Sequence, residues 1–134
     1  MIVADTNLIV YLYVNSEHTT QAEQALLKDS EWVAPFLWRS EFRNVLARYL
    51  RKGLLTLSDT RRIMNEAETL MHEREYQVRS RHVLELAASS GCSAYDCEFV
   101  ATAQDLAVPL VTVDKKLLKQ FPTVAMSLEH FVAS

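Results

Sequence analysis

Short apolar runs alternate along this chain with segments of helical periodicity, and no hairpin signal joins any two of the runs. The runs are Ile2–Asp5, Trp32–Ala34, Pro109–Val113 and Val124–Met126. With only two Gly and three Pro in the chain, tight turns between antiparallel strands should be scarce. Because parallel strands need crossover segments, usually helices, the alternation predicts an α/β fold with a short parallel sheet covered on both faces.

The helical pattern is clearest over Leu37–Lys52, where apolar side chains form one stripe and Gly53 supplies the stop. We expect Ser58-Asp59 to cap the next helix, and Tyr76–Val78 to be a connector or a minor strand. Other helices are expected at Leu8–Val14, Glu17–Asp29, Ser80–Gly91, Tyr95–Ala107, Lys115–Gln120 and after Ser127. No repeat, low-complexity tract or linker interrupts the pattern, so we expect a single domain over residues 1–134.

Missing patterns exclude several classes of function. Gly53 and Gly91 cannot form a Gly-rich phosphate loop, which excludes dinucleotide and P-loop nucleotide binding. The histidines show no metal-ligand spacing, and no nucleophile–base signature occurs. Cys92 and Cys97 fit neither a C-x-x-C motif nor a zinc pattern, which indicates a reducing compartment. No run approaches the ~20 apolar residues of a membrane span and no leader pattern opens the chain, so we expect a cytoplasmic protein.

Carboxylates follow two of the expected strands. Asp5 comes directly after Ile2–Ala4, and Asp114 directly after Leu110–Val113. In open parallel sheets the ligand site lies beyond the carboxyl ends of the strands, so both acids stand where a site is expected. Each also precedes a helix, and for either acid alone a helix N-cap is the simpler interpretation.

Two further acids lie on or beside apolar helix stripes. Asp96 falls within the apolar arc of the helix from Tyr95, where an unpaired carboxylate is costly unless the helix dipole or a partner compensates it. Glu41 borders the stripe of its own helix, where an ordinary ion pair with Arg48 is the alternative to a functional role. If all four acids converge, their repulsion requires a neutralising group, and magnesium is the hard cation that suits oxygen ligands beside a phosphate substrate. These residues therefore favour metal-assisted phosphodiester chemistry.

The charge distribution suits an anionic partner. Residues 39–81 carry ten Lys and Arg against six acids, although the whole chain has a net charge of −3. A basic middle on an acidic protein is a possible nucleic-acid footprint, and a solvated pair of helices is the simpler explanation when it is taken alone. Arg39 and Arg43 share the helix of Glu41, so we expect them to lie nearest the acids and to contact phosphate.

The chain resembles the PIN-domain family, and most closely its VapC-type toxins of toxin–antitoxin pairs. The resemblance covers essentially the whole chain, and its strength lies in four weak motifs that occur in order at the right separations. The motifs are Asp5-Thr6-Asn7, Glu41 with Asn44-Val45-Leu46, Ser93 to Ala103, and Leu110-Val111-Thr112-Val113-Asp114.

The resemblance implies a fold, an activity and partners. The fold is a three-layer α/β/α sandwich, and the activity is metal-dependent endoribonuclease cleavage. Four acids match the family's Mg²⁺ or Mn²⁺ ligands and two polar residues match their supports, namely Asp5, Glu41, Asp96 and Asp114 with Asn7 and Thr112. The implied partners are an RNA substrate and an antitoxin whose C-terminal segment crosses the acidic pocket, and family members are commonly homodimers.

Three alternatives remain open from the sequence. A PIN nuclease without an antitoxin, serving RNA processing or decay, has the same residues. A receiver-like signalling module also carries acids at strand ends, although Asp5 lacks an adjacent acid and Asp114 stands where a phosphoacceptor would be needed. A non-catalytic binding module keeps the fold without metal binding, so a divalent-metal titration separates it from the nucleases.

Overall fold

The computed structural model describes all 134 residues and contains one five-stranded parallel sheet. The strands are β1 (Ile2–Ala4), β2 (Trp32–Pro35), β3 (Glu75–Tyr76), β4 (Leu110–Thr112) and β5 (Ala125–Ser127). Their order is β3-β2-β1-β4-β5, with β1 at the centre, and every pairing is parallel. The order differs from the 2-1-3-4-5 order of receiver-like folds, which removes the fold-level basis for the signalling alternative.

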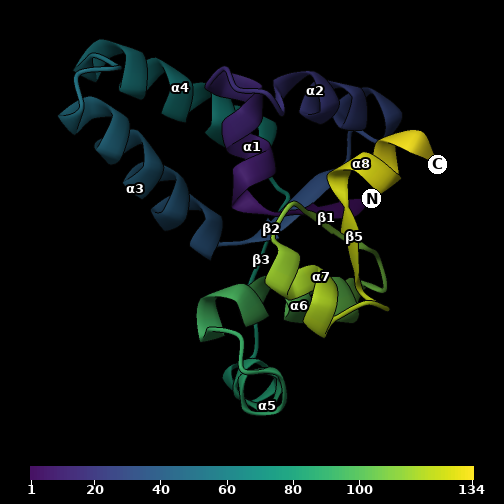
Figure 1. Ribbon diagram of the computed structural model, residues 1–134. Helices are drawn as coiled ribbons and strands as arrows, with labels where there is room; N and C mark the ends of the chain where they lie inside the picture. Colours follow the sequence, from purple (N-terminus) through teal and green to yellow (C-terminus); the bar gives the residue numbers. More distant parts are fainter.

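Seven helices connect the strands and an eighth follows the last strand, in agreement with the scarcity of hairpin turns. They are α1 (Thr6–Tyr13), α2 (Thr19–Lys28), α3 (Leu37–Arg51), α4 (Leu57–Leu70), α5 (Ser80–Ser90), α6 (Ala94–Leu106), α7 (Lys115–Gln120) and α8 (Leu128–Ala133). Helix α6 packs under β1, β2 and β4, and α1 and α8 cover the opposite face of the sheet (Figure 1). The expected α/β/α architecture is therefore confirmed, with α3 and α4 paired as an arm at one side of the sheet (Figure 1).

The core is apolar on both faces of the sheet, which explains why the strands read as continuous apolar runs. Every residue of β1, β2 and β4 is buried, and Trp32, Trp38, Phe42 and Phe99 are the largest fully buried side chains. Cys92 and Cys97 are free and buried, as expected of small hydrophobes. None of the helices has the length and apolar character needed to span a bilayer.

Two local expectations need correction. The cap of α4 is Thr56 rather than Ser58-Asp59, because Thr56 and Asp59 form a reciprocal capping box. The segment after α4 does form a minor strand, β3, but at Glu75–Tyr76 instead of Tyr76–Val78, because Glu75 and Tyr76 pair with Ala34 and Pro35 at the end of β2.

Candidate functional site

All four acids singled out from the sequence line one pocket at the carboxyl edge of the sheet. The pocket has a volume of about 220 Å³ and is lined by Asp5, Thr6, Asn7, Glu41, Asn44, Val45, Arg48, Asp96 and Asp114. Asp5 follows β1 and Asp114 lies just beyond β4, and these adjacent strands run in the same direction. The pocket therefore lies at the point where the strand order reverses around β1, which is where open α/β sheets bind ligands.

Asp5 does not serve as a helix cap. It occupies the N-cap position of α1, but its side chain makes no capping hydrogen bond. Its Oδ2 instead accepts a hydrogen bond of 2.6 Å from Thr112 Oγ1 on the neighbouring strand. Burial, and to a smaller extent the charges of Asp96 and Asp114, raise the pKa of Asp5 to about 6. A carboxylate held in this way is costly without a compensating cation.

The two carboxylate oxygens of Asp114 have different roles: one caps a helix and the other is free to bind a ligand. Its Oδ1 caps α7 by accepting hydrogen bonds from the backbone N–H groups of Lys116 and Leu117, at 2.8 and 3.3 Å. The cap interpretation is therefore right for this residue. Its Oδ2 accepts no hydrogen bond and remains available to a ligand, while its own backbone N–H donates to Thr112 Oγ1.

Asp96 and Glu41 face the strand-end acids from two helices. Ser93 Oγ caps α6 by accepting from the backbone N–H of Asp96, and the Ser93 side chain also partly offsets the rise in the pKa of the Asp96 carboxyl. Glu41 Oε1 accepts a hydrogen bond of 2.7 Å from Thr6 Oγ1 and forms no ion pair with Arg48. Burial raises the pKa of both carboxyls, reinforced at Asp96 by Asp114 and at Glu41 by Asp5.

The basic residues near the pocket are not the ones expected. Arg39 turns away and pairs with Glu68 and Glu75, with N···O distances of 2.7 and 2.5 Å. Arg43 lines a different hollow, and Arg48 is the base that lines the acidic pocket. Arg39 and Arg43 share a helix with Glu41 but do not reach the acidic pocket, because residues two positions from Glu41 point away from its face.

Sequence reasoning gave no site role to Thr6, Asn44 or Arg48. Asn44 and Arg48 lie three and seven positions after Glu41, a spacing that places them on the same helix face and could have identified them. Thr6 donates to Glu41 across 35 positions of sequence, and only the packing of α1 against α3 reveals that contact. The two residues expected to support the acids differ. The Thr112 hydroxyl donates a hydrogen bond to Asp5, whereas the Asn7 side chain lines the pocket and makes no hydrogen bond.

The donor set is compatible with a hard divalent cation. Its ligating atoms are carboxylate oxygens, which Mg²⁺ prefers, and Glu41 Oε2 and Asp114 Oδ2 are among the oxygens without a hydrogen-bond partner. No three Asp, Glu, His or Cys side chains lie close enough together to enclose a metal ion by themselves. That spacing suits a cation which keeps several waters and takes only one or two carboxylates directly.

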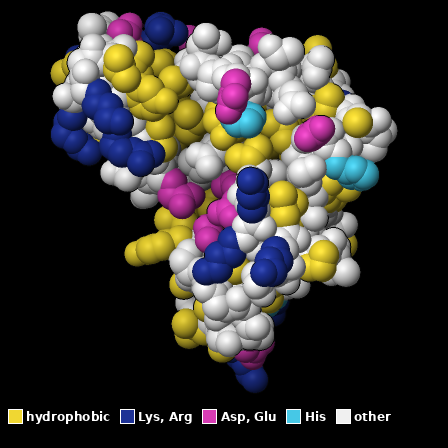
Figure 2. All heavy atoms as spheres, in the orientation of Figure 1, with side chains coloured by type: hydrophobic (Ala, Val, Ile, Leu, Met, Phe, Trp, Pro, Cys, Tyr) yellow, Lys and Arg dark blue, Asp and Glu magenta, His cyan; other side chains and the backbone are white.

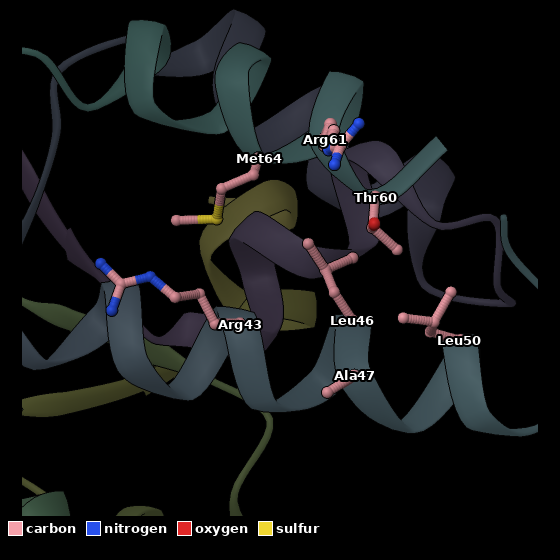
Figure 3. Close-up of a pocket in the computed structure, with 7 residues that line it drawn as sticks. All are labelled: Arg43, Leu46, Ala47, Leu50, Thr60, Arg61 and Met64. Atoms are coloured by element: carbon pink, nitrogen blue, oxygen red, sulfur yellow. The ribbon is translucent and has the colours of Figure 1, made fainter. Parts of the chain in front are cut away.

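A second, apolar hollow lies between α3 and α4. It has a volume of about 260 Å³ and is lined by Arg43, Leu46, Ala47, Leu50, Thr60, Arg61 and Met64 (Figure 3). Leu46, Leu50 and Met64 form its apolar wall, and the guanidinium groups of Arg43 and Arg61 lie at its margins (Figure 3). Leu50, Leu54 and Leu57 leave apolar surface exposed at the end of the same helical arm.

Comparisons with known proteins give the family and the fold. The sequence model of the PIN domain matches residues 2–122. Ribonuclease VapC3 of Pyrobaculum aerophilum is 29% identical over 126 residues, which are 92% of this chain and 96% of that protein. The crystal structure of PAE2754, also from Pyrobaculum aerophilum, superposes with a TM-score of 0.77 at 19% identity and covers 99% of this chain and 96% of its own. The structural likeness supports the same fold.

Proposed function

The chain belongs to the PIN domain family, and we propose that it is a Mg²⁺- or Mn²⁺-dependent endoribonuclease, the toxin of a toxin–antitoxin pair. The observation that carries the proposal is the convergence of four carboxylates, three of them with raised pKa values, in one pocket at the carboxyl edge of the sheet. The similar protein named Ribonuclease VapC3 supports the substrate and the toxin class. We further propose that residues 1–134 act as a single domain in the cytoplasm.

In this proposal Asp5, Glu41, Asp96 and Asp114 hold a hydrated cation, one or two of them as direct ligands and the others through its waters. A divalent cation supplies Lewis acidity for hydrolysis of a phosphodiester. The hydroxyl groups of Thr112 and Thr6 fix the orientation of the Asp5 and Glu41 carboxylates, as outer partners commonly do around metal sites. Arg48 provides positive charge at the pocket wall, where every other charged lining residue is a carboxylate.

A protein partner is supported by the apolar hollow between α3 and α4. Exposed leucines beside arginines suit an amphipathic segment that has acids along its margins, which is the chemistry proposed here for an antitoxin. An exposed apolar hollow is typical of a protein-binding surface, and this supports a protein partner for the chain. A homodimer is also proposed, and light scattering on the purified protein tests it.

The function is tested by incubating the purified protein with end-labelled cellular RNA in Mg²⁺, in Mn²⁺ and in EDTA. We expect discrete cuts in either metal, none in EDTA, and loss of cleavage by about a hundredfold or more in Asp96→Asn. Glu23→Gln, which removes an exposed acid on α2, is the matched control and should cleave like the wild type. Metal-independent cleavage, or full activity in Asp96→Asn, overturns the proposed mechanism.

A further inference from the structure

Basic side chains without acidic partners flank the acidic pocket on two sides. Elsewhere, Arg39, Arg62, Arg79 and Arg81 form ion pairs, whereas Arg43 and Arg61 beside the apolar hollow do not. The cations of α7 and the C-terminal half of α3 have no ion pairs. Figure 2 shows Asp and Glu side chains gathered in a hollow with Lys and Arg on either side. Unneutralised cations beside unneutralised acids indicate that an anionic ligand passes between them.

On the α3 side, Arg48 connects the acidic pocket with a neighbouring hollow. That hollow has a volume of about 230 Å³ and is lined by Arg48, Tyr49 and Lys52. Arg48 and Lys52 lie four positions apart and so share a helix face, with the half-buried Tyr49 ring beside them. Two free cations and an aromatic ring form a site that suits one nucleotide, because the cations contact phosphate and the ring stacks on a base.

On the α7 side, three lysines follow directly on Asp114. Lys115, Lys116 and Lys119 are exposed and none forms an ion pair. Lys116 Nζ donates to the carbonyl of Gly91 at 2.9 Å, which holds its charge near Asp96. The cap made by Asp114 anchors the start of α7, so these lysines have a fixed position beside the acids.

We propose that a single-stranded RNA segment crosses the acidic pocket between two defined banks of residues. The first bank is Arg48, Tyr49 and Lys52 at the C-terminal end of α3, and the second is Lys115, Lys116 and Lys119 on α7. The inference rests on the proposed nuclease function and specifies where its substrate lies. Cations on both sides offset the repulsion between RNA phosphates and the carboxylates, and Tyr49 stacks on the base next to the reacting phosphate.

The test measures binding of a fluorescein-labelled, mixed-sequence, single-stranded oligoribonucleotide by anisotropy in EDTA, where cleavage does not occur in the proposed mechanism. Three double variants are compared with the wild type: Arg48→Gln with Lys52→Gln, Lys115→Gln with Lys119→Gln, and the control Arg62→Gln with Arg81→Gln. Each removes two exposed positive charges, so a simple effect of net charge appears equally in all three. Tyr49→Phe and Tyr49→Leu test stacking separately.

We expect each bank variant to raise the Kd about tenfold at low salt, and to reduce the slope of log K against log salt by about 1.4, at roughly 0.7 per lost contact. The control should bind like the wild type, and Tyr49→Leu should bind more weakly than Tyr49→Phe. If only one bank variant loses RNA affinity, or if the control loses as much affinity as the bank variants, the two-sided path is wrong. If the wild type cuts RNA yet the bank variants bind normally, the path is wrong and the nuclease proposal stands. If the wild type neither binds nor cuts RNA, both are wrong.

Discussion

Thr112 Oγ1 donates a hydrogen bond of 2.6 Å to Asp5 Oδ2, and so ties the end of β4 to the acid that follows β1. The same hydroxyl accepts from the backbone N–H of Asp114 at 3.0 Å. One fully buried side chain therefore joins both strand-end acids. Its hydrogen bond opposes the effect of burial on the Asp5 carboxyl, because it favours the ionised form that a cation needs.

Replacement of Thr112 tests this connection. Thr112→Val keeps the shape of the side chain but removes the donor, so the ionised form of Asp5 is less favoured and its orientation is lost. We expect the affinity for Mn²⁺, measured by isothermal titration calorimetry, to fall about ten- to hundredfold. Thr112→Ser keeps the hydroxyl and should bind Mn²⁺ nearly as well as the wild type. Equal affinities in Val and Ser variants would show that the hydroxyl has no part in the site.

Thr6 should act on Glu41 in the same way. Its hydroxyl donates a hydrogen bond of 2.7 Å to Glu41 Oε1, and this is the only hydrogen bond to that carboxylate. We expect Thr6→Val to lower the rate of RNA cleavage roughly tenfold or more, and Thr6→Ser to restore most of it. Circular dichroism checks that both variants fold. A normal cleavage rate in folded Thr6→Val argues against Glu41 as an oriented ligand.

The positions of the strand-end acids could be predicted because topology alone determines them. Parallel strands end at one edge, so Asp5 and Asp114 had to be neighbours once β1 and β4 paired. Asp96 was found because an acid in an apolar stripe needs an explanation. The strand order and the capping box at Thr56 were beyond the sequence pattern, since several orders satisfy the same alternation and a Ser-Asp pair resembles a cap equally well.

The contacts between distant segments could not be predicted from local spacing. Thr6 meets Glu41, and Arg39 meets Glu75, only because helices and strands far apart in the chain pack together. Arg39 lies two positions before Glu41 in the sequence, but a helical wheel places it on a different face and gives no information on which neighbour it meets. Its expected contact with RNA phosphate therefore conflicts with its ion pairs, although the wheel did place Glu41 at the border of the apolar stripe.

Removal of the Asp5 charge should stabilise the metal-free protein above pH 6. Because the pKa of Asp5 is raised from 3.8 to about 6, the native state holds a proton that the unfolded state has lost. By linkage, stability falls as pH rises from about 4 through 6, at a cost of up to about 3 kcal/mol at pH 7. In EDTA, we expect the free energy of unfolding of Asp5→Asn to exceed that of the wild type by up to this amount at pH 7. Near pH 4 the two free energies should be equal.

Urea unfolding at both pH values measures this difference. Glu23→Gln, an exposed acid on α2, is the control and should change stability little at either pH. Added Mg²⁺ should stabilise the wild type more than Asp5→Asn, since a ligand that binds only the native state raises its stability. A metal-free Asp5→Asn that is no more stable than the wild type at pH 7 contradicts a strained, ionised Asp5.

Arg39 should stabilise the fold rather than bind RNA. Its guanidinium donates to both oxygens of Glu75, at 2.5 and 2.6 Å, and Trp38 Nε1 donates to the same carboxylate at 2.8 Å. The Glu75 side chain is only 8% exposed, so Arg39→Gln leaves a nearly buried charge with Trp38 as its remaining donor. We expect a loss of about 2 kcal/mol in the free energy of unfolding at pH 7.

The pH dependence and a comparison with Arg48 make this prediction specific. The hydrogen bond from Arg39 lowers the pKa of Glu75, so the stabilisation is present at neutral pH and is lost as pH falls through the native pKa. The difference between Arg39→Gln and wild type should therefore shrink in acid, while RNA binding at pH 7 stays unchanged. Arg48→Gln, which breaks no ion pair, should show the reverse: wild-type stability with weaker RNA binding. If Arg39→Gln has wild-type stability and weaker RNA binding, the prediction is wrong and Arg39 contacts the RNA.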